Sequence, residues 1–153
     1  MKTLFILLLS GLSFICQAQY QFTGTITRVI DGDTFWFACK YGSFKVRMAG
    51  IDAPESKQTF GKESKAFLAR FTNKRAVIKT IQTDKYGRYV AFVFVDNVCI
   101  NLLCVRYGYA WNYVYFNTNS SYALAQKLAQ KENKGLWLFA HVEPWNYRKN
   151  HNK

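Results

Sequence analysis

Four of the nine acidic residues in this chain are gathered between positions 31 and 55, although the chain as a whole is strongly basic. They are Asp31, Asp33, Asp52 and Glu55. Carboxylates repel phosphate, so a protein that only held a polyanion would keep them away from its binding face. Their clustering therefore indicates a bound cation, whose positive charge would offset the carboxylates and let phosphate approach. A ligand set made only of oxygen suits the hard cations calcium and magnesium.

Two arginines are interleaved with these acids along the chain. Arg47 lies five residues before Asp52, and Arg88 closes the polar segment 83–88. A guanidinium group binds phosphate oxygens two at a time and stays charged, so it suits a transition state that builds negative charge. A cation, carboxylates and two arginines together indicate hydrolysis of phosphodiester bonds.

Three ordered motifs resemble those of the staphylococcal nuclease (thermonuclease) family. They are VIDGDT at 29–34, VRMAGIDAPE at 46–55 and TDKYGR at 83–88. The similarity runs from about residue 23 to residue 137, and the segment 144–149 resembles the tail of many secreted members. Each motif alone could be an ordinary turn or strand, but the three in this order are specific.

The resemblance implies a calcium site. Asp33 and Asp52 would ligate the ion through their carboxylates and Ala53 through its backbone carbonyl, at a position where many family members have threonine. Asp31 would not ligate the ion directly but would support the site through a bridging water.

The resemblance also implies how the substrate is bound and cut. Glu55 would act as general base on the attacking water, and Arg47 and Arg88 would bind the scissile phosphate. Lys85 and Tyr86 would contact a neighbouring phosphate, and Tyr113 or Tyr115 would pack against the nucleotide. The expected activity is a calcium-dependent endonuclease that acts on DNA and RNA and leaves 3′-phosphate ends.

The N-terminal segment has the layout of a signal peptide. Lys2 is followed by an almost unbroken apolar run over 4–15, and Cys16-Gln17-Ala18 places small residues for cleavage after Ala18. We therefore expect export to the periplasm or the medium, with residues 1–18 removed. The mature chain, 19–153, is expected to be one nuclease domain, with a core at about 23–137 and an aromatic and basic tail at 138–153.

The mature chain is strongly basic. Loss of Lys2 lowers the net charge of +12 by one, to +11. Such a charge favours an anionic partner, which could be nucleic acid, an acidic polymer or a membrane surface. We expect DNA and RNA as substrates and a monomeric protein. We also expect no stable association with membranes, because no segment after the leader is long and apolar enough to span one.

Cysteine and histidine offer little chemistry. Cys39, Cys99 and Cys104 remain after cleavage, and this odd number leaves open one bridge with a free thiol or a fully reduced set. His141 and His151 lie in the tail, where we expect them to take no part in catalysis.

The elements that must position these residues are short strands with one inserted helix. Residue patterns predict strands at 22–29, 34–38, 44–48, 76–81 and 90–95, the last buried on both sides. They predict helices at 65–72, 101–107 and 121–133, the last begun by Ser121 with Leu124, Leu128 and the alanines facing inward. We expect an α+β, mainly β, fold: a five-stranded oligonucleotide-binding-fold barrel with about three helices, over which the aromatic segment 137–147 packs.

Two rival functions remain for a basic chain of this kind. One is a nucleic-acid-binding barrel without catalysis, although such modules typically lose the acids or arginines that this chain keeps. The other is a basic exported protein that binds acidic polymers, which leaves the carboxylate cluster unexplained.

Overall fold

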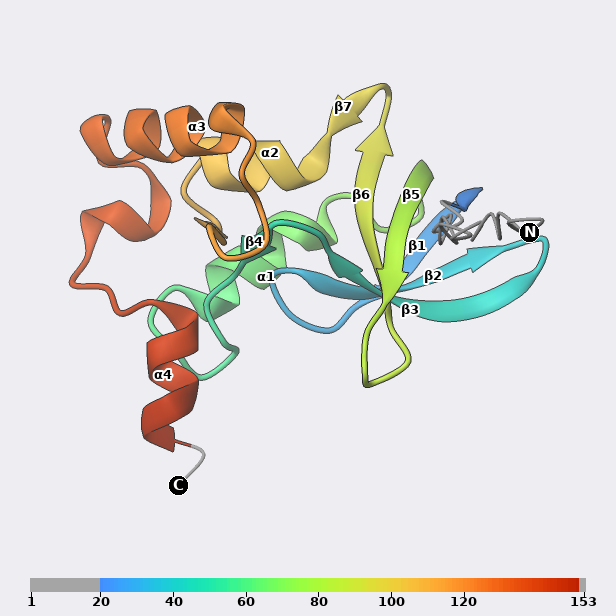
Figure 1. The fold of residues 1–153 in the computed structure, drawn as a ribbon, viewed down its shortest axis with the longest axis horizontal. Coiled ribbons are helices and arrows are strands. Elements are labelled where there is room, and N and C mark those ends of the chain that lie inside the picture. Colours follow the sequence, from blue (N-terminus) through green and yellow to red (C-terminus); the bar gives the residue numbers. More distant parts are fainter. Residues whose placement is uncertain (1–19, 152–153) are drawn as a thin grey trace, which may run out of the picture.

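Five strands close into a barrel in the computed structural model, which describes residues 20–151 (Figure 1). The strands pair in the order β3-β2-β1-β5-β6, and a parallel pairing of β3 with β6 closes the ring. Their bounds are β1 Gln21–Val29, β2 Thr34–Cys39, β3 Gly42–Met48, β5 Arg75–Thr83 and β6 Tyr89–Val95. The mainly β, α+β barrel predicted from the sequence is confirmed. The expected signal peptide at 1–18 lies outside the described residues.

The strands form because apolar side chains alternate along them and fill the barrel. Phe35 and Phe37 of β2, Val46 of β3, Ile78 of β5 and Val93 of β6 are each fully buried. Side chains at every second position of a strand point to the same face, so one face of each strand supplies the core. The register of β3 on β6 places Arg47 opposite Val90 at the end of the barrel where β3 finishes.

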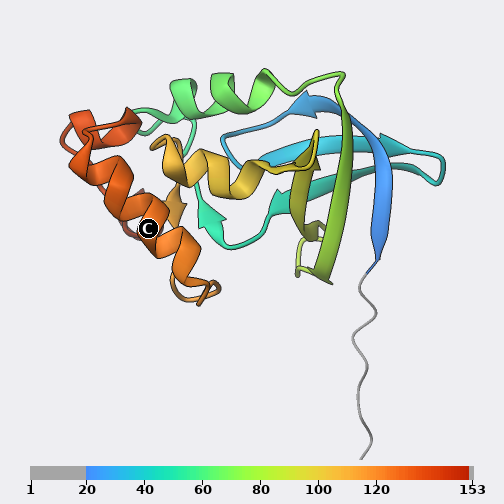
Figure 2. The ribbon, with the colours of Figure 1, turned by 90° about the horizontal axis from the view of Figure 1, so that it is seen from above.

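Helices and the C-terminal segment gather at one end of the barrel, as both views show (Figures 1 and 2). A short two-stranded sheet, β4 Ile51–Asp52 with β8 Trp111–Asn112, lies at this end. β7, Val98–Cys99, extends the edge of β6. The remaining elements are α1 Gly61–Ala69, α2 Ile100–Arg106, α3 Ser120–Lys131, the 3₁₀ turn η1 Gly135–Leu138 and α4 Pro144–His151.

The helices differ from the sequence prediction in number and position. The described residues contain four α-helices and a 3₁₀ turn rather than about three helices, because α4 forms within the expected tail. α1 begins at Gly61, four residues before the predicted start, after Phe60 with a φ of 69°. Only glycine fits at 61, because a Cβ there would overlap the carbonyl oxygen of Glu55.

Three further expectations were wrong, one about β6 and two about α3. β6 alternates between buried and half-buried side chains, so only one of its faces is fully covered. α3 is capped by Asn119, whose side chain accepts a hydrogen bond from the Ser121 N–H, and not by Ser121. Leu124 is exposed and Leu128 is half-buried, because α3 turns Tyr122, Ala125 and Ala129 toward the core, so the expected inward position holds for these two alanines and not for Leu124.

Cys39, Cys99 and Cys104 all carry free thiols. Burial raises the pKa of the Cys104 thiol well above its usual range, so this thiol stays protonated. Among residues 20–151, no helix has both the length and the apolar character needed to cross a bilayer.

Candidate active site

The turn between β1 and β2 places Asp33 at the mouth of the barrel. The Asp31 carboxylate accepts a hydrogen bond from the Asp33 N–H at 3.1 Å, which fixes the turn. The Asp33 carboxylate is itself buried, and it accepts hydrogen bonds from the Thr34 hydroxyl at 2.9 Å and from the Ala53 N–H at 2.8 Å. These contacts tie the first motif to the second across 20 positions of sequence.

Gly32 allows this turn to lie directly against its neighbours. A Cβ at this position would overlap the Ser64 hydroxyl of α1 and would lie 2.6 Å from the Ala53 Cβ. The glycine is therefore needed for close packing between the turn, α1 and the second motif.

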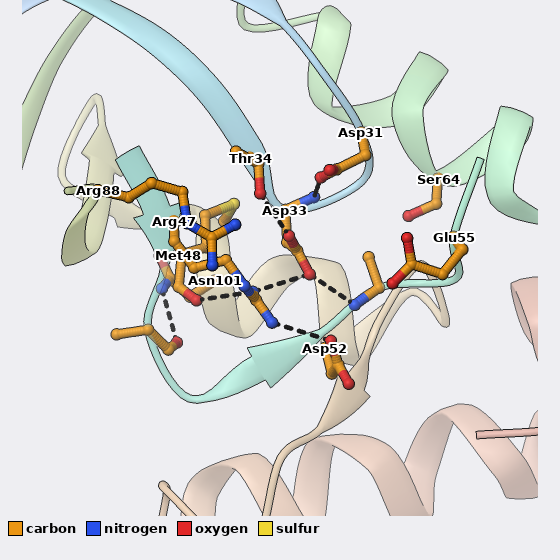
Figure 3. A network of polar contacts seen from close by, with 12 residues as sticks. Asp31, Asp33, Thr34, Arg47, Met48, Asp52, Glu55, Ser64, Arg88 and Asn101 are labelled. Atoms are coloured by element: carbon orange, nitrogen blue, oxygen red, sulfur yellow. Dashed lines mark hydrogen bonds and ion pairs between the residues drawn. The ribbon is translucent and has the colours of Figure 1, made fainter. Parts of the chain in front are cut away.

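Arg47 lies between two buried carboxylates (Figure 3). Its Nη1 is 2.8 Å from Asp33 Oδ2 and its Nη2 is 2.9 Å from Asp52 Oδ1. Nη1 also donates to the Met48 carbonyl at 3.1 Å. Because the guanidinium plane is held at three points, Arg47 is preorganised at the end of β3.

A buried amide supports the β3–β4 turn that joins Arg47 to Asp52. Asn101 of α2 is fully buried, and its Nδ2 donates to the Ala49 carbonyl at 2.9 Å and to the Ala91 carbonyl at 3.1 Å. Its Oδ1 accepts from the Val93 N–H at 2.9 Å. The turn is thus fastened to β6 and α2 together.

The hairpin between β5 and β6 positions Arg88. The Asp84 carboxylate accepts hydrogen bonds from the backbone N–H groups of Tyr86 and Arg88 and from Arg88 Nε at 2.7 Å. Burial alone would raise the pKa of Asp84, but the hydrogen bonds from Arg88 and Tyr86 outweigh it and the pKa is lowered. Asp84 therefore stays ionised and holds the guanidinium of Arg88 in place.

These pieces meet in one cleft of about 780 Å³. Ten of the eleven candidate residues line it: Asp31, Asp33, Arg47, Asp52, Ala53, Glu55, Lys85, Tyr86, Arg88 and Tyr113. Tyr115 does not line the cleft; its side chain is 73% exposed and packs edge-on against Tyr113, at 5.7 Å between ring centres. Of the two tyrosines weighed for nucleotide packing, the geometry therefore favours Tyr113.

Burial shifts the pKa of two carboxyl groups of the cleft upward. Burial raises the pKa of Asp31 to about 7, and the charge of Asp33 adds to the rise. Burial also raises the pKa of Asp52, although the hydrogen bond from Arg148 and the charge of Arg47 lower it in part. Such upward shifts occur where a further positive charge would be stabilising.

The cleft residues from Arg47 to Phe116 fall within a segment that matches known proteins, whereas Asp31, Asp33, Thr34 and Arg148 lie outside it. The model of the "Staphylococcal nuclease homologue" family matches residues 45–138. The chain is 35% identical over 128 residues to an "Uncharacterized endonuclease" of Escherichia coli, covering 82% of this chain and 84% of that protein. It is also 33% identical over 145 residues to a "Micrococcal nuclease" of Shigella flexneri, covering 86% and 83%.

The chain belongs to the staphylococcal nuclease family. A similar protein of Haemophilus influenzae, also named "Uncharacterized endonuclease", is 36% identical over 130 residues and covers 83% of this chain. The resemblance read from the three motifs is therefore confirmed, and the roles of the individual residues remain predictions.

The donor chemistry of this nuclease cleft fits a hard cation. Asp33 and Asp52 supply buried carboxylate oxygens, and among residues 20–151 neither a thiol nor an imidazole lines the cleft. In the described part of the chain, no three acidic, histidine or cysteine side chains form a ready ligand cluster. The predicted set does not need one, because it combines two carboxylates with the Ala53 carbonyl. Asp33, Asp52 and Ala53 would hold the ion, with Asp31 beside them.

The sequence analysis did not single out Arg148, a charged residue of the nuclease cleft. Arg148 of α4 reaches into the cleft, where its Nη2 is 2.7 Å from Asp52 Oδ2 and its Nη1 is 2.7 Å from Glu55 Oε1. The one sequence feature that includes Arg148 is the segment 144–149, which resembles the tail of secreted family members but by itself indicates no role in the site. The Asn101 amide was also missed, because an asparagine in a predicted helix gives no sign of its partners.

Proposed function

We propose that this member of the family is an exported, calcium-dependent endonuclease that hydrolyses DNA and RNA. The observation that carries the proposal is the shared cleft, in which Arg47 of β3 and Arg88 of the β5–β6 hairpin line the same cavity as Asp33, Asp52 and Glu55. Cationic side chains that cannot lose their protons, next to buried carboxylates, suit a phosphodiester and not a neutral substrate.

The chain's own residues would divide the work as follows. Arg47, fixed by Asp33 and Asp52, and Arg88, fixed by Asp84, would bind the phosphoryl oxygens and stabilise the charge that grows on them. The half-exposed Glu55 carboxylate would take the proton of the attacking water. When bound, calcium would supply positive charge that neutralises the phosphate and polarises it.

The expected products follow from the family resemblance. The water oxygen would bond to phosphorus while the bond from phosphorus to the 5′-oxygen breaks. The phosphate would then remain on the 3′-oxygen, and the leaving strand would carry a 5′-hydroxyl group. End-group analysis of a labelled oligonucleotide after cleavage tests this; a 5′-phosphate end would contradict it.

The first test is hydrolysis of single-stranded DNA by the mature protein, residues 19–153, in calcium and then in chelator. Cleavage is expected only with calcium, and Asp33→Ala should abolish it. Full activity in chelator would refute the metal dependence. Tight binding without cleavage in either condition would refute catalysis and leave a nucleic-acid-binding barrel.

Individual roles are tested by removing one side chain at a time. Glu55→Ala and Arg88→Ala should each lower turnover by about 10²–10⁴-fold while circular dichroism stays unchanged. Arg47→Ala also leaves the buried Asp33 carboxylate without its counter-ion and Asp52 with Arg148 alone, so Arg47→Lys is the better variant at this position. Lys65→Ala, which removes an exposed charge from α1, is the matched control and should keep full activity.

Export rests on the pattern of the first 18 residues and has its own test. N-terminal sequencing of the protein recovered from the periplasm or the medium should give Gln19 as the first residue. A protein that is retained in the cell with its leader intact would contradict export.

A further inference from the structure

The C-terminal helix places a third arginine on the carboxylates of the cleft. α4 lies beside the segment that joins β4 to α1 (Figure 1), and Arg148 on α4 contacts two of the site residues. Arg148 Nη1 donates to Asp52 Oδ1 at 3.2 Å and to Glu55 Oε1 at 2.7 Å, while Nη2 donates to Asp52 Oδ2 at 2.7 Å. Both oxygens of Asp52 and one oxygen of Glu55 are thus engaged by a single guanidinium group.

Aromatic packing holds α4 in this position. The Trp145 ring stacks on Tyr113, at 5.4 Å between ring centres and 19° between planes. It also meets Trp111 edge-on at 5.8 Å. Just before α4, the carbonyl of Val142 accepts a hydrogen bond from Gln58 Nε2 at 2.5 Å. We call the helix Pro144–His151, with Trp145 and Arg148 as its two contacts, the C-terminal latch.

The latch contacts the groups that the proposed reaction needs. Asp52 is the buried carboxylate expected to bind calcium, Glu55 is the expected base, and Tyr113 is the tyrosine expected to pack against the nucleotide. A carboxylate oxygen that accepts a guanidinium N–H at 2.7 Å has one lone pair occupied and its charge partly neutralised. A divalent ion on the same oxygens would lie against a like charge.

We propose that the C-terminal latch and the calcium ion compete for Asp52, and that the latch also occupies the Glu55 carboxylate, so that the latch is an intramolecular inhibitor released when the ion binds. The inference rests on the proposed function, because it takes calcium as the ion. Arg148 suits this role better than Arg47, which is enclosed with only 15% of its side chain exposed. Arg148 keeps 35% exposed and lies on a terminal helix that can move without opening the barrel.

Competition has a measurable consequence for calcium affinity. A ligand that binds only the open form has its apparent affinity reduced by the fraction of molecules that are open. If the latch is closed in about nine-tenths of the molecules, its removal should tighten calcium binding about tenfold. A single surface charge removed from the same helix should change the affinity by less, because solvent and salt screen it.

The experiment is calcium titration by calorimetry of the wild type, Arg148→Ala, Trp145→Ala and Lys149→Ala, without nucleic acid. The first two variants should bind calcium about tenfold more tightly than the wild type. Lys149→Ala is the matched control: it removes an exposed charge from the same helix and should stay within about twofold of the wild type. Circular dichroism establishes that each variant is folded, and two latch variants keep the test informative should one of them fail to fold.

Hydrogen exchange of the latch gives a second readout that does not depend on activity. Amides of residues 145–151 should exchange slowly without calcium and faster at saturating calcium in the wild type. Equal calcium affinity in the wild type and both latch variants would overturn the proposal that the latch competes with calcium. Weaker calcium binding after Arg148→Ala would also overturn it and would make Arg148 a supporting residue of the site. If the wild type and all variants bind no calcium, the proposed metal dependence falls and the latch falls with it.

Discussion

Asn101 should be one of the most sensitive positions in the molecule, although it touches no substrate. Its amide makes three hydrogen bonds in a fully buried setting, to the backbone of Ala49, Ala91 and Val93. Asn101→Leu keeps roughly the same volume and removes all three. The Ala91 carbonyl keeps the Ala49 N–H as a donor, so two groups, the Val93 N–H and the Ala49 carbonyl, lose the amide partner.

The cost follows from the desolvation of those two groups. A buried polar group left without its partner costs about 1–3 kcal/mol, so the free energy of unfolding should fall by about 2–6 kcal/mol. Domains of this size have a total of about 5–15 kcal/mol, so the loss is a large fraction of the stability. Asn101→Leu should also lower kcat/KM in the molecules that remain folded, because the released turn carries both Arg47 and Asp52.

Urea unfolding followed by circular dichroism measures the first effect. Gln130→Leu, which removes an exposed amide from α3, is the matched control and should change the free energy of unfolding by less than about 0.5 kcal/mol. A loss below about 1 kcal/mol for Asn101→Leu would refute the reasoning, since it would mean that the turn does not depend on this amide.

Three further perturbations test other parts of the structure. Asp84→Ala should lower kcat/KM by about 10–100-fold with little change in melting temperature, because it releases Arg88 on an exposed hairpin. A large fall in melting temperature, or an unchanged kcat/KM, would contradict this. Gly32→Ala should lower the free energy of unfolding by about 1–3 kcal/mol in urea titration, because the added methyl group overlaps α1. Hydrogen bonds from Arg106 lower the pKa of Glu132 from 4.5 to about 2, so its contribution to stability is present above pH 4.5 and is lost as the pH falls toward 2. The stability difference between the wild type and Glu132→Gln should therefore shrink over that interval, and a difference that grows on acidification would contradict the ion pair.

The barrel was predictable because its signals are local. Alternating apolar residues mark the strands, and polar or glycine-containing turns separate them, so neighbouring residues carry enough information. The two-residue strands β4, β7 and β8 have too little sequence for a period to show, and they form because the surrounding elements hold them. The start of α1 was missed for a similar reason: Gly61 is set by its contact with the Glu55 backbone and not by a capping residue.

The candidate site was predictable where its members belong to recognisable motifs. Asp33, Arg47 and Arg88 were found in this way, and the structure brings them into one cleft. Residues that act through distant partners were not. Asn101 bonds to Ala49 across 52 positions, and Arg148 bonds to Asp52 across 96, so no pattern of neighbours could show either pair.

The two arginines that contact Asp52 show how the cleft can be both stable and active. Arg47 also pairs with Asp33, and its side chain is mostly buried. It would therefore stay in place when a cation binds. Arg148 pairs with Asp52 and with the more exposed Glu55. Burial alone would lower the pKa of Arg148, but its bonds to Asp52 and Glu55 outweigh this and raise it, so the guanidinium stays charged. Because a buried carboxylate without a counter-charge is unstable, a charged but removable side chain can stabilise Asp52 until a cation replaces it. The same contact that completes the fold in the absence of metal would therefore have to be given up for catalysis.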